Sequence, residues 1–256
     1  MISERIIEAF CLPPERVGKE IQNDAQKELT GKELNLLHSE FPDFENWIKG
    51  KAVVDFGCGL GFQTTALANV GAEKVLGLDV NAEYIDYANR YAGECAEDKS
   101  KLVFSSNSKD QTGKYDAVIS QNAMEHYTHP SEVLESMKDL IRGDGQLMVT
   151  FGPPWYAPYG SHMHFFCKLP WVNILFPETA VMQVRKRYRN DGAKRYEEVE
   201  SGLNKMSVSK FEKLCKDHCL KVVYRRYRCI KGLDFLSSIP MLRELFINRV
   251  TVVLKK

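Results

Sequence analysis

One short stretch sets the architecture of this chain: Ala52-Val53-Val54-Asp55-Phe56-Gly57-Cys58-Gly59-Leu60-Gly61. Its first five residues form a short apolar run, which is typical of a buried parallel strand. The glycines that follow are typical of a tight turn, because glycine adopts positive φ and lets a ligand approach the backbone. A helix begun at this turn would offer unpaired N–H groups at its N-terminus. The stretch therefore predicts a strand, a ligand-binding loop and a helix.

Strands and helices continue to alternate along the chain, which predicts an α/β fold with a doubly wound, mostly parallel sheet and helices on both faces. We expect further strands at 74–79, 102–104, 116–120, 145–151, 220–229 and 249–254. We expect helices at 62–70, 81–95, 131–141 and 207–218, with Asn81 as an N-cap. Residues 105–114 are too few for a long crossover helix, so they predict a loop or a single turn.

Two segments fall outside this alternation. Residues 1–50 predict an N-terminal helical segment that covers the ligand site, and residues 51–256 predict the main domain. Within that domain, prolines, aromatic residues and histidines crowd the stretch from 152 onwards, and charged residues follow. We interpret residues from about 152 to 206 as a lid-like insertion after the fifth strand.

Composition limits the classes of partner. The 256 residues include 35 Lys and Arg against 34 Asp and Glu, so the formal net charge is +1. A dedicated nucleic-acid binder usually carries a basic excess, and no apolar run approaches the roughly 18 residues of a membrane span. The first residues lack a signal-peptide layout, and the 7 scattered cysteines are typical of reduced thiols. We expect a cytoplasmic protein with no nucleic-acid or membrane partner.

The spacing of the glycines distinguishes between two nucleotide cofactors. A dinucleotide fingerprint, G-x-G-x-x-G, would need a third glycine at position 62, which is Phe62. The run is instead G-x-G-x-G, and Asp79 ends the next strand about 20 residues further on, where a carboxylate can bind ribose hydroxyls. This arrangement resembles motif I of the class I S-adenosylmethionine-dependent methyltransferases, most closely over residues 50–151. The resemblance implies a Rossmann-like seven-stranded sheet whose last strand is antiparallel.

The resemblance also implies a set of cofactor contacts. In that family the loop holds the methionyl end of S-adenosylmethionine, the acid after the second strand holds the ribose, and an acid after the third strand binds the adenine amino group. This chain has Ser106 and Asn107 in place of the last acid, and residues after the fourth strand face the cofactor. The implied cofactor-binding residues are Asp55, Gly57, Cys58, Gly59, Gly61, Asp79, Val80, Ser106, Asn107, Gln121 and Asn122.

A histidine follows the fourth strand, where sites of open α/β sheets lie. The segment Ser120–Tyr127 resembles the same stretch of small-molecule O- and N-methyltransferases, including phosphoethanolamine methyltransferases, in which this histidine is assigned as a base. The resemblance therefore implies that His126 is a general base, a role that suits imidazole chemistry. The alternative is that His126 only packs or bonds a backbone carbonyl.

The insertion offers a second group of polar and aromatic side chains. Trp155, Tyr156 and Tyr159 are rigid enough to form a pocket wall, so we expect them to bind substrate. His162 and His164 point the same way if the backbone is extended. They could bind substrate, act as the base instead of His126, or join His126 in a metal site. Ordinary hydrogen bonding is the simpler interpretation, and we expect no metal.

The densest basic stretch, residues 185–195, has two interpretations. Its arginines and lysines could receive a phosphate, a carboxylate or RNA. Neighbouring acids offset the charge, so we interpret the stretch as a solvated face. Together the patterns predict an S-adenosylmethionine-dependent enzyme that methylates an oxygen, or less readily a nitrogen, of a small molecule. The alternatives are an RNA- or protein-modifying methyltransferase and a non-catalytic protein that binds the cofactor.

Overall fold

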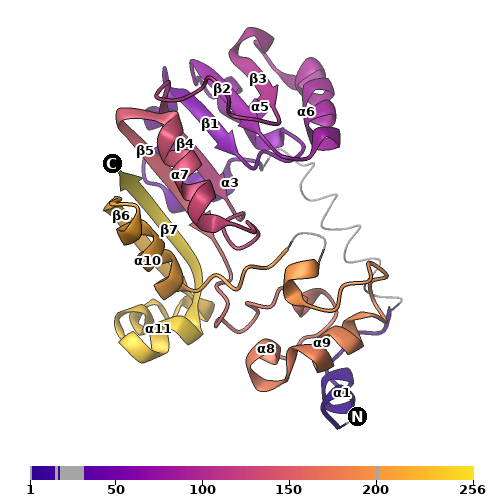
Figure 1. Cartoon of the computed structure of the whole chain (residues 1–256). Helices are drawn as coiled ribbons and strands as arrows, with labels where there is room; N and C mark the ends of the chain where they lie inside the picture. Colours follow the sequence, from indigo (N-terminus) through magenta and orange to yellow (C-terminus); the bar gives the residue numbers. More distant parts are fainter. Residues whose placement is uncertain (1, 15–16, 18–31, 200–201) are drawn as a thin grey trace.

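The computed structural model describes residues 2–14, 17, 32–199 and 202–256 (Figure 1). Seven strands form one sheet in the order β3-β2-β1-β4-β5-β7-β6, and β7 runs antiparallel to both of its neighbours. The predicted seven-stranded fold with an antiparallel last strand is confirmed. The strands are β1 (Ala52–Phe56), β2 (Lys74–Leu78), β3 (Leu102–Ser105), β4 (Tyr115–Gln121), β5 (Ile141–Phe151), β6 (Lys221–Cys229) and β7 (Ile247–Lys255).

Helices cover both faces of the sheet, because successive residues of each buried strand point to opposite faces. On one face Val53 packs with α3 (Asn35–Glu40), α4 (Phe44–Ile48) and α5 (Phe62–Asn69). On the other face Val54 packs in the cluster that contains residues of α7 (Pro130–Leu140) and α10 (Val208–Asp217). Of the other helices beside the sheet, α6 (Ala82–Cys95) packs against α5, and α11 (Pro240–Phe246) lies next to the turn Asp234–Ser238.

Local signals explain where the central helices begin. The Asn81 side chain accepts hydrogen bonds from the backbone N–H groups of Glu83, at 2.9 Å, and Tyr84, so the predicted N-cap of α6 is confirmed. Residues 106–114 contain no helix between β3 and β4, as their length predicts. The sequence patterns did not predict α11 or the short turns Ile230–Gly232 and Asp234–Ser238, because short irregular segments carry no helical periodicity.

The insertion after β5 forms a hydrophobic core of its own. It contains α8 (Val172–Leu175), α9 (Glu178–Arg185) and the turns Met163–Phe165 and Tyr196–Glu198. The N-terminal helix α1 (Ile2–Glu8) packs beside α9, and Ile7 is fully buried in the same cluster as Phe166 and Val181 (Figure 1). The sheet and the insertion thus have separate hydrophobic cores.

No helix of the described residues is long and apolar enough to cross a membrane. The expected N-terminal cover of the ligand site includes residues 18–31, which lie outside the described ranges. Residues 32–36 follow that segment and lie beside the glycine loop, where Lys32, Glu33 and Leu36 line a cavity.

Candidate active site

The glycine loop, residues 57–61, is held against the end of β2 by its own backbone. The N–H groups of Gly57 and Cys58 donate to the carbonyl oxygen of Leu78 at 2.8 and 2.9 Å. The φ angles of Gly57 and Gly59 are +80° and +52°, which L side chains rarely adopt. A Cβ atom at Gly59 would meet nothing within 4 Å, so this glycine faces open space. The loop therefore presents bare backbone to a ligand.

Asp79 lies directly beside this loop. One carboxylate oxygen, Oδ2, accepts the Gly59 N–H at 2.9 Å, and the other, Oδ1, accepts the Asn81 N–H at 3.0 Å. Each carboxylate oxygen can accept a further hydrogen bond, so the group is held in place and remains able to bind hydroxyls. The next side chain, Val80, is 94% exposed. An apolar side chain left in solvent beside a fixed carboxylate is suited to packing against a flat ligand.

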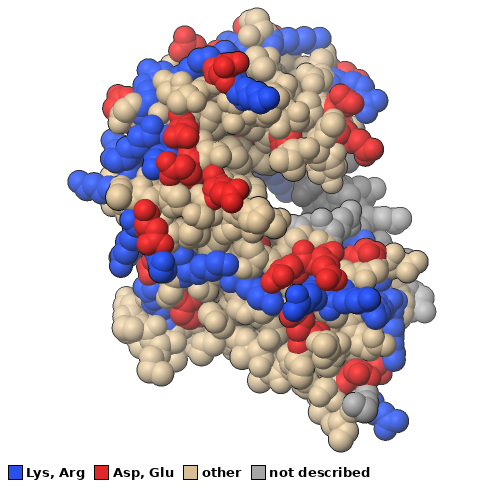
Figure 2. All heavy atoms as spheres, in the orientation of Figure 1, with Lys and Arg blue, Asp and Glu red and all other residues tan. Residues whose placement is uncertain are grey.

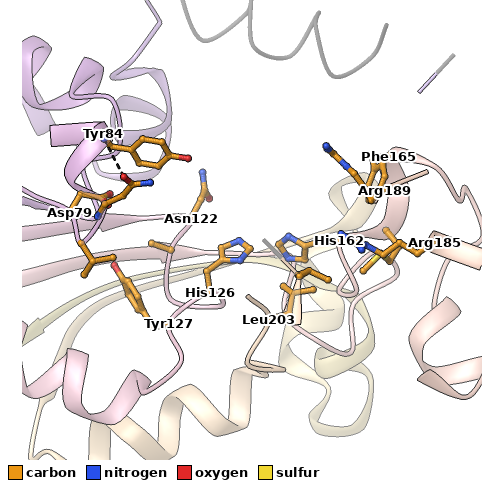
Figure 3. Close-up of a pocket in the computed structure, with 16 residues that line it drawn as sticks. Asp79, Tyr84, Asn122, His126, Tyr127, His162, Phe165, Arg185, Arg189 and Leu203 are labelled. Atoms are coloured by element: carbon orange, nitrogen blue, oxygen red, sulfur yellow. Dashed lines mark hydrogen bonds between the residues drawn. The ribbon is translucent and has the colours of Figure 1, made fainter. Parts of the chain in front are cut away.

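A cavity of about 740 Å³ runs from Asp79 into the insertion (Figure 3). In the close-up, Asp79, Tyr84 and Tyr127 lie at one end, His126 and His162 in the middle, and Arg185 and Arg189 at the other end. The residues that line the cavity are Gly57, Asp79, Val80, Asn81, Tyr84, Asn122, Ala123, His126, Tyr127, His162, Met163, Phe165, Arg185, Arg189, Val199 and Leu203. The cavity thus joins the sheet edge to the insertion.

Two further cavities adjoin the glycine loop and contain most of the other expected cofactor contacts. One of about 570 Å³ is lined by Cys58, Gly59, Gln121 and Asn122, together with Gln63. The other, of about 260 Å³, is lined by Val80, Ser106 and Asn107. These two cavities lie beside Gly59 and Asp79, so the expected residues after β1, β2, β3 and β4 meet at one edge of the sheet.

Two of the expected cofactor-binding residues, Asp55 and Gly61, do not line any of these three cavities. Asp55 is buried at 2% exposure and lines none of these cavities. Its oxygens accept hydrogen bonds from Gln63 Nε2 and Thr64 Oγ1, both at 2.6 Å, and burial raises its pKa to about 6. Gly61 turns into α5 and packs on α6, where a Cβ would lie 2.6 Å from the Cβ of Ala88. Both residues shape the loop from behind.

His126 has one ring nitrogen fixed by the backbone. Its Nδ1 lies 2.8 Å from the carbonyl oxygen of Gly202. A carbonyl oxygen only accepts, so Nδ1 carries a hydrogen and Nε2 keeps its lone pair in the neutral ring. The alternative interpretation, that His126 only bonds a backbone carbonyl, therefore describes the contact of Nδ1 but assigns no partner to Nε2. The other nitrogen remains available to take a proton from a group in the cavity.

His162 packs edge-on against His126, with ring centroids 5.1 Å apart and an interplanar angle of 87°. Its Nε2 lies 3.4 Å from the carbonyl oxygen of Pro153. Burial, and the nearby His126, lower the pKa of His162 to about 4. A ring with so low a pKa is neutral at physiological pH and is a weak base. The geometry therefore favours His126 for proton transfer and His162 for packing and hydrogen bonding.

The other insertion residues expected at the site lie elsewhere. His162 has a φ of 56° and a 3-10 turn follows it, so the backbone is not extended and His164 does not share its direction. His164 is exposed, with its ring 6.0 Å from that of Tyr159. Trp155 packs on Tyr196 in the insertion core, with the two ring centroids 5.0 Å apart. The side chain of Tyr156 is 44% exposed. The described residues lining the 740 Å³ cavity include none of Trp155, Tyr156, Tyr159 and His164.

Turns explain this placement. The Ala157 N–H donates to the carbonyl oxygen of Pro154 at 2.9 Å, and the Gly160 N–H donates to that of Ala157 at 3.0 Å. A Cβ at Gly160 would lie 2.2 Å from the Pro154 oxygen, so the segment folds back on itself. The aromatic cluster therefore packs within the insertion instead of lining the cavity. Among the described residues, no group of three His, Cys, Asp or Glu side chains could hold a metal ion.

The structure adds residues that the sequence patterns did not single out. Tyr84 and Tyr127 flank Asp79, and Phe165 and Leu203 form apolar wall in the insertion (Figure 3). Tyr84 could have been found from its position one turn after the Asn81 cap, at the same edge of the sheet. Arg185 and Arg189 were visible as a basic pair four residues apart. The interpretation as a solvated face is wrong for Arg185, which is 4% exposed.

Comparison with known proteins agrees with this geometry. A family model described as a methyltransferase domain matches residues 54–147. The ubiquinone biosynthesis O-methyltransferase of Shewanella halifaxensis is 33% identical over 115 residues, which cover 44% of this chain and 48% of that protein. Its counterpart in Paraburkholderia phytofirmans is 28% identical over 115 residues, with 44% and 49% covered. The chain thus spans about half the length of the curated relatives it matches.

Solved structures share the fold across most of the chain. The S-adenosylmethionine-dependent methyltransferase from Mesorhizobium loti has a TM-score of 0.56 at 13% identity, covering 90% of this chain and 100% of that chain. Magnesium protoporphyrin IX methyltransferase from Synechocystis, with bound SAH, has a TM-score of 0.56 at 18% identity, covering 92% and 87%. The sequence match assigns residues 54–147 to the methyltransferase-domain family, and most of the chain has the fold of S-adenosylmethionine-dependent methyltransferases.

Proposed function

We propose that this protein transfers a methyl group from S-adenosylmethionine to an oxygen atom of a small-molecule acceptor, with His126 as the general base. The observation that carries the proposal is that one cavity holds both Asp79 and His126 (Figure 3). A cofactor bound at the sheet edge and an acceptor bound beside His126 would therefore meet in the same space. Methyl transfer requires this proximity above all, because it is an in-line displacement.

The residues at the sheet edge fit the cofactor. The open backbone at Gly59 and the neighbouring Gln63 and Gln121 would hold its methionyl end, in the cavity of about 570 Å³. The Asp79 carboxylate, fixed by two backbone N–H groups, would accept hydrogen bonds from its ribose. Val80, Ser106 and Asn107 would surround its adenine. When bound, S-adenosylmethionine supplies a methyl group on a positively charged sulfur.

His126 would supply the proton transfer. The Gly202 carbonyl fixes the tautomer with hydrogen on Nδ1, which leaves Nε2 as the acceptor. As the acceptor oxygen begins to bond to the methyl carbon, its hydroxyl proton passes to Nε2, so no positive charge develops on that oxygen. His162, neutral because its pKa is lowered to about 4, packs against the ring and keeps its orientation.

Two considerations favour oxygen over nitrogen. A hydroxyl is a poor nucleophile until its proton is removed, so a base beside the acceptor helps an oxygen more than a neutral amine. The relatives from Shewanella halifaxensis and Paraburkholderia phytofirmans are named as O-methyltransferases.

We further propose that residues 1–50 cover the cofactor side, which the position of Lys32, Glu33 and Leu36 beside the glycine loop supports.

The test is turnover with S-adenosylmethionine labelled in its methyl group and a metabolite extract as the source of acceptor. We expect label in a small-molecule fraction, and transfer of no label would overturn the proposed activity. With the acceptor identified, His126→Asn should lower kcat by about 100-fold or more. The control, His129→Asn, changes an exposed histidine three residues away and should stay within twofold. Equal activity of both variants would remove His126 as the base.

A further inference from the structure

The end of the cavity furthest from Asp79 is basic. Figure 3 shows Arg185 and Arg189 beyond the two histidines, with Phe165 beside them. An acceptor placed with its oxygen at His126 would extend either back toward the cofactor or onward to this end. The cofactor occupies the first direction in the proposed function, so the body of the acceptor extends toward the arginines.

Arg185 is a buried and rigidly held cation. Its Nη1 and Nη2 donate to the two carboxylate oxygens of Asp191 at 2.7 and 2.5 Å, and its side chain is 5% exposed. The guanidinium holds the pKa of Asp191 at about 2. The Arg185 Nε donor has no acceptor within the described part of the chain. A buried donor without an acceptor is costly, and Asp191 compensates the charge but not this donor.

Arg189 is the cation at this end of the cavity that has no carboxylate partner among the described residues. It follows Arg185 by one helical turn, and its guanidinium carbon lies 5.3 Å from the centroid of the Phe165 ring. Within residues 2–14, 17, 32–199 and 202–256, no carboxylate forms an ion pair with Arg189. Other cations nearby do have such partners, since Arg187 pairs with Glu8 at 2.7 Å. Figure 2 likewise shows Lys and Arg side chains of the insertion beside Asp and Glu.

The chemistry of this end selects an anion. The Arg185–Asp191 pair is neutral overall, so Arg189 gives this end of the cavity a net positive charge. Arginine binds carboxylates and phosphates through charge-assisted hydrogen bonds. The residues that line the cavity also include the apolar side chains Met163, Phe165, Val199 and Leu203, which suit an apolar body.

We propose that the methyl acceptor is a small molecule with an apolar body and a terminal anionic group, a carboxylate or a phosphate monoester, which binds Arg189 beside Arg185. This assignment rests on the proposed function, because the methyl-accepting oxygen at His126 fixes which end of the molecule meets the arginines. The anionic group is then a specificity determinant, and Arg189 is its main contact. Arg185 holds the site in shape through Asp191.

The experiment measures binding of four probes to the full chain saturated with S-adenosylhomocysteine. Benzoate and phenyl phosphate carry the two anionic groups on one apolar ring, and benzamide and benzyl alcohol are uncharged counterparts. We expect benzoate, phenyl phosphate or both to bind at least fivefold more tightly than the uncharged probes in calorimetric titration. The tighter of the two anions identifies the acceptor's anionic group. The preference should weaken as ionic strength rises.

Variants connect the preference to the arginines. Arg189→Gln should lose about tenfold or more of the anion affinity. Arg187→Gln, which removes a neighbouring cation that pairs with Glu8, should keep it. Anions that bind no better than benzamide, or equally well to Arg189→Gln, would overturn this inference. If the anions show no preference but S-adenosylhomocysteine binds, only this inference fails and the proposed function is unaffected. If S-adenosylhomocysteine does not bind, both proposals are contradicted.

Discussion

The glycine loop at the sheet edge and the insertion after β5 contribute to the same cavity in different ways. At the sheet edge, functional groups lie directly after strands, and the backbone fixes them: Gly57 and Cys58 bond Leu78, and Gly59 bonds Asp79. In the insertion, side chains reach the cavity through turns such as the one at His162, over a separate hydrophobic core.

The difference shows which part of an enzyme can diverge independently. A sheet edge made of strand ends has little freedom, because register and strand order place every residue. An insertion with its own core can change its cavity-facing side chains without disturbing the sheet. We infer that the sheet edge binds the cofactor and the insertion selects the acceptor. The following predictions test this division.

The largest effect is expected for Gly61→Ala at the sheet edge. Its φ is +80° and a Cβ would lie 2.6 Å from that of Ala88, so strain and overlap add. We expect a loss of about 3–5 kcal/mol in the free energy of unfolding, measured with urea. Gly59→Ala is the matched control, because its Cβ would meet nothing within 4 Å. It should cost about 1–2 kcal/mol of stability and weaken cofactor binding instead. Equal destabilisation would contradict this distinction.

Asp55 should make the stability of the sheet edge depend on pH. Burial raises the pKa of its carboxyl from 3.8 to about 6. Between these values the native state binds a proton that the unfolded state lacks, so the stabilising contribution is lost as pH rises. The expected loss from pH 4 to 6 is on the order of 2–3 kcal/mol. Asp55→Asn should lack this pH-dependent contribution when its free energy of unfolding is measured with urea at pH 4.5, 5.5 and 6.5. The same pH dependence in the wild type and in Asp55→Asn would contradict the burial argument for Asp55.

The insertion should show the opposite pH effect. Burial lowers the pKa of His162 from 6.5 to about 4, so between these values the unfolded state binds a proton that the native state excludes. Stability contributed by neutral His162 is therefore lost as pH falls from 6.5 to 4, also on the order of 2–3 kcal/mol. His162→Gln should be less sensitive to acid than the wild type. A steeper acid response than that of the wild type would contradict the burial argument.

A smaller effect separates the core of the insertion from the cofactor site. Trp155→Ala removes a half-buried ring that contacts Tyr196 and lies 5.7 Å from Lys205 Nζ. We expect a loss of about 1–2 kcal/mol in unfolding free energy and no change in cofactor affinity. Tyr156→Ala, on the exposed neighbour, should change stability by less than about 0.5 kcal/mol. If Trp155→Ala leaves stability unchanged and raises the acceptor KM, the sequence-based assignment of Trp155 to the substrate is the better one.

Much of the fold could be predicted from sequence because its signals are local. The apolar run 52–56, the glycines after it and the cap at Asn81 each specify a backbone conformation. Topology rules for parallel sheets then place Asp79, Gln121 and Asn122 at one edge without further information. The helices of the insertion and α11 lack such signals, because they are short and depend on packing for their stability.

The site was less predictable where side-chain direction matters. Asp55 matches the motif, yet its carboxylate is buried against Gln63 and Thr64 and lines none of the three cavities, since a strand residue can face either side. His162 and His164 differ because of one positive φ angle, which sequence does not specify for a histidine. Arg185 is buried because Asp191, six residues away, folds back to pair with it. Such pairings depend on tertiary structure.

Titration of the protein with S-adenosylmethionine by calorimetry tests the central claim most directly. The wild type should bind one equivalent, and Asp79→Ala should bind at least about 50-fold more weakly, because a charged acceptor of ribose hydrogen bonds is lost. Asp86→Ala, which changes an acid of α6 that lines none of the three cavities, should bind like the wild type. The absence of binding to the wild type, or unchanged affinity in Asp79→Ala, would contradict the account.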